Sequence, residues 1–222
     1  MTDTPRIKLY YSPGACSFAS HIVLHETGVP FTAERVVIAD GANIRPEYLA
    51  INPRGRVPTL IVDGVAVTEN SAILTWLGQR DGRLFPARGT LAAARASEWL
   101  AWLTSAVHIS FAQIWRGHRF ADDILHHEAI RARGLKTLEQ HFAEIEGRLV
   151  TGPFALGSDY SVVDPNLLVF YRWGNRIELP MRERYPAWTR HTETLLARDA
   201  VQKTIAAEGI VIFGNVANAR PT

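Results

Sequence analysis

The sequence is poor in cysteine: among its 222 residues, Cys16 has no second cysteine to pair with. This excludes an internal disulfide framework and an internal dithiol pair, and it is typical of proteins in a reducing compartment. Any redox chemistry at Cys16 therefore needs a thiol from outside the chain.

Strong net charge and long apolar runs are missing as well. The formal net charge is +2 and charged residues make up 21% of the chain, so no strong field favours nucleic acid or an acidic membrane surface. The longest apolar runs are far too short to span a bilayer, and the first five residues lack a basic-then-apolar signal pattern. We therefore expect a soluble cytoplasmic protein that binds neither nucleic acid nor a membrane.

Short strand and helix patterns alternate in residues 1–82. The patterns predict strands over 7–11, 31–38, 59–62 and 65–67, the last two joined by the hairpin turn Asp63-Gly64. They predict helices over 16–27 and from about 71 to 77, with one helical turn near 46–49. Asn70 and Ser71 both suit the N-cap of the later helix. This order predicts a thioredoxin-like α/β domain.

The composition changes after residue 82. Residues 83–90 contain Pro86 and Gly89 and are predicted to be a linker. Helical periodicity then predicts helices over about 90–116, 122–150, 161–173, from 186 onward, and 199–208, with no assignment after 210. We expect residues 91–222 to form an all-helical domain.

Cys16 stands where the first strand turns into the first helix. Unpaired backbone N–H groups and the helix dipole favour negative charge there, so the thiol should ionise more readily than a free cysteine. The alternative is that Cys16 is simply a small buried apolar residue.

Several segments resemble, in order and over nearly the whole chain, the cytosolic glutathione transferases, most closely the bacterial beta class. They are Lys8 to Ser17 with His21-Ile22, Ala50 to Pro58, Thr68 to Ile73, Glu98 to Leu100, Val107-His108 and Ser161 to Asp164. The resemblance implies a thioredoxin-like N-terminal domain, an all-α C-terminal domain and a homodimer. It implies glutathione as a co-substrate, with no permanently bound cofactor.

The resemblance also implies a glutathione site. Val57-Pro58 is expected to be cis, with the backbone of Val57 pairing with the peptide-like ligand. A helix start at Glu69, Asn70 and Ser71 would hold the γ-glutamyl ammonium and carboxylate, although ordinary helix capping explains those residues too. Arg56 belongs to the expected site, and the glycyl carboxylate is left to Arg54, Arg56 or Arg45.

Four residues are the implied catalytic candidates: Cys16, Tyr11, Ser17 and His108. Cys16 would either stabilise the glutathione thiolate or form a mixed disulfide with it. Tyr11 and Ser17 are its competitors, because other transferase classes activate the thiol with Tyr or Ser. A lone His on a helix is more often solvated or satisfied in a core, but His108 aligns with a family segment that reaches the thiol site.

Phe111, Ala112 and Trp115 follow His108 at helical spacing. They suit a small hydrophobic electrophile held beside the sulfur, and the alternative is that Phe111 and Trp115 are core. Two positions depart from the beta-class pattern: Ala101 stands where Asn is common, and Ile109 stands where Lys is common. We expect no metal site, because neither His21 with His25 nor His126-His127-Glu128 has an obvious further ligand.

Three functions remain open from the sequence. The first is conjugation of glutathione to apolar electrophiles. The second is glutathione-dependent thiol–disulfide reduction through a mixed disulfide at Cys16. The third is non-catalytic binding of hydrophobic ligands or partner proteins on a transferase scaffold.

Overall fold

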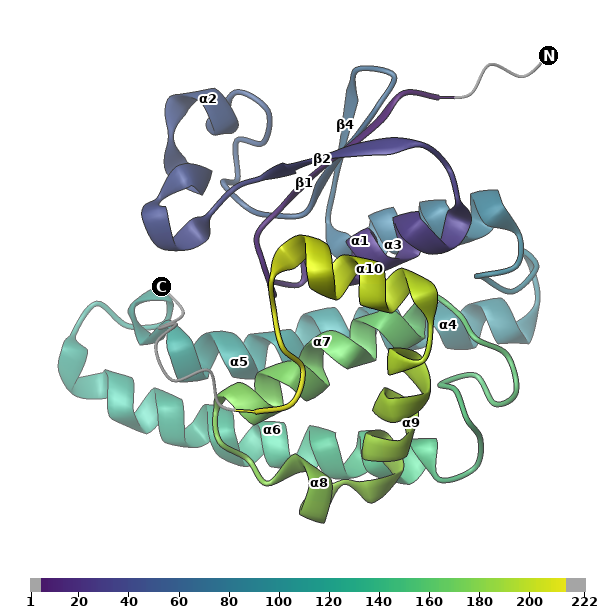
Figure 1. The fold of residues 1–222 in the computed structure, drawn as a ribbon. Helices are drawn as coiled ribbons and strands as arrows, with labels where there is room; N and C mark the ends of the chain where they lie inside the picture. The colour runs from purple at the N-terminus through teal and green to yellow at the C-terminus, as the bar shows by residue number, and fades with distance from the viewer. Residues whose placement is uncertain (1–4, 215–222) are drawn as a thin grey trace.

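The computed structural model describes residues 5–214, in which an α/β part is followed by a helical part (Figure 1). The outer ends of the proposed domains 1–82 and 91–222, residues 1–4 and 215–222, lie outside the described residues. The architecture confirms the predicted fold class.

A four-stranded sheet in the order β2-β1-β3-β4 forms the α/β part. β1 (Ile7–Tyr11) lies parallel to β2 (Phe31–Arg35) and antiparallel to β3 (Thr59–Val62), and β4 (Val65–Thr68) closes the hairpin. The predicted strand over 31–38 is too long. β1 ends at Tyr11, whose C=O accepts the N–H of Val36. Beyond Val36 the second strand has no partner in β1, and the chain enters a 3₁₀ turn, Ile38–Asp40.

The two faces of the sheet are covered by different helices. Leu9 packs into the main core with α1 (Ser17–Thr27), and α3 (Asn70–Asp81) lies beside α1. Tyr10 points the other way and meets Tyr48 of the short helix α2 (Pro46–Leu49), with ring centroids 5.7 Å apart. Successive side chains of β1 therefore point to opposite faces of the sheet, and both faces are covered.

The helical part begins with one long helix, as predicted over 90–116, and a π-helical segment interrupts this helix. α4 (Leu91–Trp102) passes through a π-helical segment, Leu103–Val107, into α5 (His108–Trp115). The remaining helices are α6 (His127–Leu149), α7 (Val163–Arg176), α8 (Met181–Arg184), α9 (Pro186–Leu196) and α10 (Asp199–Glu208).

Two predicted boundaries in this part are wrong, and one short helix was not predicted. The helix predicted over 122–150 starts at His127, because a 3₁₀ turn capped by Asp123 occupies Ile124–His126. α7 continues past Trp173 to Arg176. The four-residue helix α8 is too short to show a periodic pattern.

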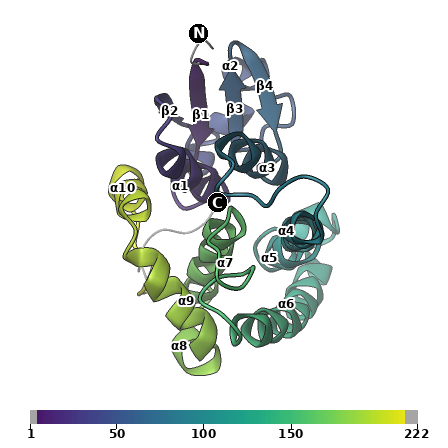
Figure 2. The same ribbon diagram turned by 90° about the vertical axis from the view of Figure 1, so that its right-hand side faces the viewer.

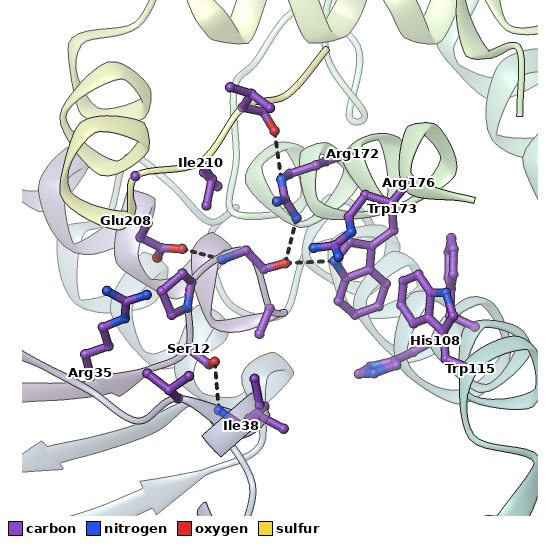
Figure 3. Close-up of a pocket in the computed structure, with 18 of the residues that line it drawn as sticks. Ser12, Arg35, Ile38, His108, Trp115, Arg172, Trp173, Arg176, Glu208 and Ile210 are labelled. Carbon is purple, nitrogen blue, oxygen red and sulfur yellow. Dashed lines mark hydrogen bonds between the residues drawn. The ribbon is translucent and has the colours of Figure 1, made fainter. Parts of the chain in front are cut away.

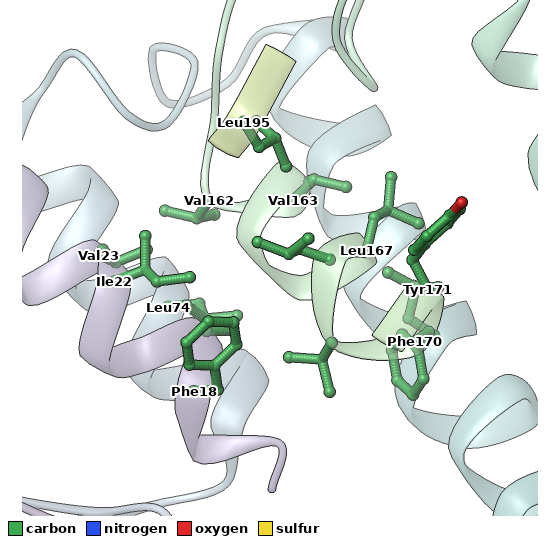
Figure 4. Close-up of a cluster of buried hydrophobic side chains, with 14 of the residues drawn as sticks. Phe18, Ile22, Val23, Leu74, Val162, Val163, Leu167, Phe170, Tyr171 and Leu195 are labelled. Carbon is green, nitrogen blue, oxygen red and sulfur yellow. The ribbon is translucent and has the colours of Figure 1, made fainter. Parts of the chain in front are cut away.

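Helix α1 joins the two parts. Its residues Phe18, Ile22 and Val23 are fully buried and face Leu74 of α3 and the side chains of α7 (Figure 4). α10 packs along the same helix (Figure 2). The α/β part and the helical part therefore share one hydrophobic core. The proposed linker 83–90 is also tied to this core, since the C=O of Leu84 accepts the N–H of Val162 at 2.9 Å.

Within residues 5–214, the helices include none with the length and apolar character needed to cross a membrane.

Candidate active site

Two adjoining cavities lie where the turn after β1 meets α5 and α7. The first, of about 340 Å³, is the Cys16 cavity; its walls include Cys16, Arg56, Val57, Pro58, Glu69 and Asn70. The second, of about 410 Å³, is the interdomain cavity, walled by the Ser12–Ala15 turn, the start of the 38–40 segment, α5, α7 and the end of α10 (Figure 3). His108, Ala112 and Arg116 line both cavities. The two cavities therefore meet at α5.

Cys16 occupies the N-cap position of α1, and its Sγ donates a hydrogen bond to the C=O of Val57 at 3.4 Å. Burial raises the pKa of this thiol to about 11, although Arg116 and the N–H groups of Cys16 and Ser17 act to lower it. The expected easy ionisation is therefore wrong for the ligand-free protein. Desolvation outweighs the helix terminus, and the thiol is a hydrogen-bond donor at neutral pH.

The Val57–Pro58 peptide bond is cis, which confirms that prediction. The C=O of the preceding Arg56 accepts hydrogen bonds from Tyr48 Oη (2.6 Å) and Asn52 Nδ2 (2.7 Å), so this segment is held from behind. The Val57 N–H has no hydrogen-bond partner within residues 5–214. An extended ligand strand can take up this free donor.

The start of α3 differs from the prediction. Glu69, not Asn70 or Ser71, holds the N-cap position, with a positive φ of 70° and no capping bond from its side chain. Its carboxylate accepts from Arg54 Nη1 at 3.0 Å. The N–H groups of the first turn of α3 have no acceptor within the helix, so they remain available to an anion at this end of the cavity.

Asn70 and Ser71 bind neighbouring helices instead of capping. The Asn70 amide accepts from Ser20 Oγ (2.6 Å) and donates to Asn166 Oδ1 (3.2 Å). The Ser71 hydroxyl pairs with Thr104 Oγ1 at 2.7 Å, and Ser71 does not line the Cys16 cavity. These bonds fix the position of the helix start against α1, α7 and the long helix.

Besides Arg54, which is paired with Glu69, three arginines line the Cys16 cavity: Arg56, Arg116 and Arg119. Burial lowers the pKa of Arg116, and burial together with Arg116 and Arg56 lowers that of Arg119. No carboxylate within residues 5–214 lies within 4.0 Å of any of the three. They therefore form an unneutralised anion-binding cluster.

Sequence reasoning missed Arg116 and Arg119, although the run Arg116-Gly117-His118-Arg119 after the predicted helix is a local concentration of basic residues. Of the residues considered for the glycyl carboxylate, Arg54 and Arg56 line the cavity. Arg45 bonds the C=O of Asp40 and lines neither cavity.

His108 lies between the two cavities. Its ring meets Trp173 and Phe170 edge-on, with centroids 5.2 and 6.2 Å away. Burial lowers the pKa of His108 to about 4, and Arg116, Arg56 and Arg119 act in the same direction. The imidazole is therefore neutral at pH 7.

Tyr11 and Ser17 line neither cavity. Tyr11 shares the face of β1 that carries Leu9, so its ring is buried against His21, 4.9 Å away. Ser17 is fully buried, and its hydroxyl donates to the C=O of Ser12 and accepts the N–H of Ser12. Both residues support the turn that carries Cys16.

Phe111, Ala112 and Trp115 all line the interdomain cavity. Phe111 is also fully buried and packs against Phe142 at 6.0 Å, so it serves as both cavity wall and core. Ile210 and Val211, from the segment after α10, complete the wall, and no sequence pattern pointed to them.

Side chains from the helical part hold Gly14, in the turn before Cys16. Its N–H donates to Glu208 Oε2 at 2.7 Å, and its C=O accepts from Arg172 Nη1 (3.1 Å) and Trp173 Nε1 (2.9 Å), as Figure 3 shows. Gly14 has a φ of 66°, and a Cβ there would collide with the Arg172 guanidinium. Glu208 also bonds His21 Nδ1 at 2.9 Å.

Within residues 5–214, no group of three or more His, Cys, Asp or Glu side chains is arranged to hold a metal ion. His21 and His25 stack with centroids 5.3 Å apart. The run His126-His127-Glu128 was expected to be a solvated helix face. His126 and Glu128 are exposed, but His127 is half-buried and its Nε2 lies 2.8 Å from the C=O of Ala121.

Comparisons with known proteins agree on one family. The family models for the N-terminal and C-terminal domains of glutathione S-transferases match residues 14–80 and 128–194. Glutathione S-transferase GST-4.5 of Xanthomonas campestris pv. campestris is 30% identical over 211 residues, covering 92% of this chain and 100% of that protein. Glutathione S-transferase GstA of Escherichia coli O157:H7 is 28% identical with the same coverage. Disulfide-bond oxidoreductase YfcG of E. coli K12 is 26% identical, covering 90% and 94%.

Solved structures are similar along the whole chain. A glutathione transferase homologue from Sulfitobacter, with bound glutathione, has a TM-score of 0.85 and 31% identity, covering 93% of this chain and 99% of that one. A beta-class glutathione S-transferase from Sphingomonas chungbukensis has a TM-score of 0.80 and 31% identity, covering 92% and 100%.

Proposed function

Because this chain belongs to the glutathione S-transferase family, we propose that it conjugates the thiol of glutathione to small apolar electrophiles, as a cytoplasmic homodimer. One observation carries the proposal. A protonated thiol, Cys16, faces the basic Cys16 cavity close to where that cavity meets the aromatic-lined interdomain cavity. Such a junction suits a reaction between a charged thiolate and an apolar partner.

The Cys16 cavity offers a complementary protein group for each charge of glutathione. The γ-glutamyl carboxylate meets the first N–H groups of α3, and its ammonium meets Glu69. The cysteinyl backbone pairs with Val57, whose N–H has no partner in the described part of the chain. The glycyl carboxylate meets Arg56, Arg116 and Arg119, which line this cavity.

We propose that Cys16 stabilises the glutathione thiolate by donating a hydrogen bond. A thiol with a pKa of about 11 keeps its proton at neutral pH, so it can donate to a neighbouring anionic sulfur. Arg116 adds positive charge, and neutral His108 offers one ring N–H or lone pair beside the reacting atoms. With an aryl chloride, the S–C bond forms, chloride leaves with the C–Cl electron pair, and the thiol proton passes to the buffer.

Conjugation of glutathione to chlorodinitrobenzene tests this function. A hydrogen bond to a charged group contributes about 1.5–3 kcal/mol, so Cys16→Ala should lower kcat/KM by about 10- to 100-fold. Cys16→Ser keeps a hydroxyl donor and should retain more activity. Tyr11→Phe is the matched control, because Tyr11 lies outside both cavities, and it should stay near wild type. Absence of turnover and of glutathione binding would refute the proposal.

Disulfide reduction is the second candidate, favoured by the similarity to the oxidoreductase YfcG. The Cys16 thiolate would attack the glutathione sulfur of a glutathionylated substrate, forming a mixed disulfide with glutathione and releasing the substrate as its thiolate. A second glutathione thiolate would then regenerate Cys16 and leave as oxidised glutathione. The raised pKa of Cys16 opposes this route, because little thiolate is present at neutral pH. Mass spectrometry after incubation with oxidised glutathione decides it: one added glutathione on Cys16, with loss of reductase activity in Cys16→Ala, would favour reduction.

A further inference from the structure

The interdomain cavity carries more positive charge than an apolar electrophile needs. Arg35, Arg116, Arg172 and Arg176 line it, together with one carboxylate, Glu208. Apolar and aromatic side chains form much of the remaining wall, among them Val37, Ile38, Phe111, Trp115, Trp173 and Ile210. The cavity therefore combines an apolar surface with several guanidinium groups.

Glu208 is already bonded to other groups. It is 4% exposed, and both of its oxygens already bond the N–H of Gly14 and the ring of His21. No ion pair within 4.0 Å joins it to Arg35 or Arg172 in the described part of the chain.

Arg172 is a buried cation whose partners are neutral. It is 4% exposed, and it donates through Nε to the C=O of Val211 (2.9 Å) and through Nη1 to the C=O of Gly14 (3.1 Å). Its Nη2 has no hydrogen-bond partner within residues 5–214. Burial lowers the pKa of Arg172 to about 10, in keeping with an incompletely compensated buried charge. An anion reaching this wall would satisfy the group.

Arg35 and Arg172 lie apart from the reactive end of the cavity. In Figure 3, Arg35 lies on the Glu208 side, with Arg172 above the centre, whereas His108 and Trp115 lie on the opposite side. His108 and Arg116 also line the Cys16 cavity, so the glutathione sulfur enters from their side. A ligand spanning the cavity therefore has its reacting carbon near His108 and its far end near Arg35.

We propose that the interdomain cavity binds an organic acid: an apolar, preferably aromatic body with a carboxylate or sulfonate held by Arg35 and Arg172. Resting on the proposed function, this acid is the electrophile, attacked by glutathione at the end remote from its anionic group. The fixed guanidinium groups select for an acid over its neutral analogue, because the neutral compound leaves the buried charge uncompensated.

Binding is tested first, without turnover. Anilinonaphthalenesulfonate and the uncharged N-phenylnaphthylamine share an aromatic body and differ by the sulfonate, and both report binding by fluorescence. The sulfonate should bind at least about 10-fold more tightly, and Arg35→Gln should reduce the preference to about 3-fold or less. Arg35 is exposed, so this variant should fold normally. Arg131→Gln, an exposed arginine outside both cavities, should keep the wild-type preference.

Conjugation is tested with 4-chloro-3-nitrobenzoate and its amide. The kcat/KM for each compound is divided by the rate constant of its uncatalysed reaction with glutathione, so that the comparison excludes their different intrinsic reactivities. The acid should be favoured about 10-fold, and the preference should fall in Arg35→Gln. Equal use of both compounds, or preference for the amide, would overturn the inference while leaving conjugation intact. If neither these compounds nor chlorodinitrobenzene is conjugated but the sulfonate preference depends on Arg35, the organic-acid site stands and the proposed function fails.

Discussion

At the scale of single residues, two opposed effects determine the chemistry of Cys16. The N-cap position of α1 and the Arg116 guanidinium favour a thiolate, whereas removal from water favours the thiol. Burial dominates and raises the pKa to about 11. The residue is thereby suited to donate a hydrogen bond, and it is poorly suited to attack a disulfide at neutral pH.

Alkylation of the ligand-free protein by iodoacetamide should follow this pKa. Since Cys16 is the sole cysteine, the rate reports its thiolate fraction directly and should rise through pH 9 toward a midpoint near 11. Arg116→Gln should move the midpoint higher, because Arg116 lowers the pKa of the thiol, whereas Arg131→Gln should leave it unchanged. A midpoint below about pH 8 would contradict the assignment of Cys16 as a donor.

The lowered pKa of His108 makes stability depend on pH. Its ordinary value is 6.5 and its folded value is about 4, so between these values the unfolded chain binds a proton that the folded protein does not. The free energy of unfolding should therefore fall as the pH drops through this window. Water in the cavities screens part of the effect, and we expect a loss of about 1–3 kcal/mol.

Urea unfolding at about pH 7 and pH 4.5 measures this loss. His108→Gln, which cannot titrate, should lose less stability than wild type over the same interval. The exposed His118→Gln should behave like wild type. An identical acid-induced loss in His108→Gln and wild type would show that other groups are responsible.

At the scale of elements, the end of α10 holds the turn that precedes α1. Glu208 accepts the N–H of Gly14 and bonds His21 of α1, while Arg172 and Trp173 of α7 hold the Gly14 carbonyl. The turn leading to Cys16 is thus positioned by side chains that lie 158 to 194 residues from Gly14 in the sequence.

Glu208→Ala should therefore reduce both stability and activity. Truncation leaves the Gly14 N–H and a His21 nitrogen buried without partners, which should lower the free energy of unfolding by about 3 kcal/mol. kcat/KM should fall as the turn loosens. Glu208→Gln keeps an acceptor for the Gly14 N–H and should lose less of both, and Glu183→Ala, at an exposed position on α8, serves as the surface control. Full activity in Glu208→Ala would mean that the remaining bonds to Gly14 suffice.

At the scale of the whole molecule, α1 is a structural element of both parts. Because its buried face packs on α3 on one side and on α7 and α10 on the other, neither part has a complete core without it (Figures 2 and 4). We expect the two parts to unfold together.

Phe18→Ala tests this coupling. Phe18 is fully buried, so the cavity left behind should cost about 3–5 kcal/mol. Tryptophan fluorescence, which mostly reports the helical part, and circular dichroism should show coincident transitions shifted to lower urea. Leu125→Ala, at a side chain that is 82% exposed, should leave the midpoint nearly unchanged. Separate transitions, with the fluorescence change unaffected by Phe18→Ala, would contradict a shared core.

Local features were predictable from the sequence wherever neighbouring residues decide them. Alternating side chains define β1, the Asp63-Gly64 turn defines the hairpin, and the segments around Cys16, Val57-Pro58 and Glu69 carry the family resemblance. The boundaries that failed, at residue 35 and at residues 122–127, depend on where a pairing partner ends or on a short 3₁₀ turn. Neither leaves a periodic signal.

The sequence by itself determined the fold class, the family and the place of Cys16 at a strand-to-helix turn, because these follow from short-range patterns. Only the tertiary structure decided that Cys16 is a protonated donor, that Arg116 and Arg119 surround it, and that Arg35, Arg172 and Glu208 meet at one cavity. The physical reason is that desolvation and charge proximity depend on which distant segments pack together, and the packing around α1 brings residues 14, 35, 172 and 208 to one place.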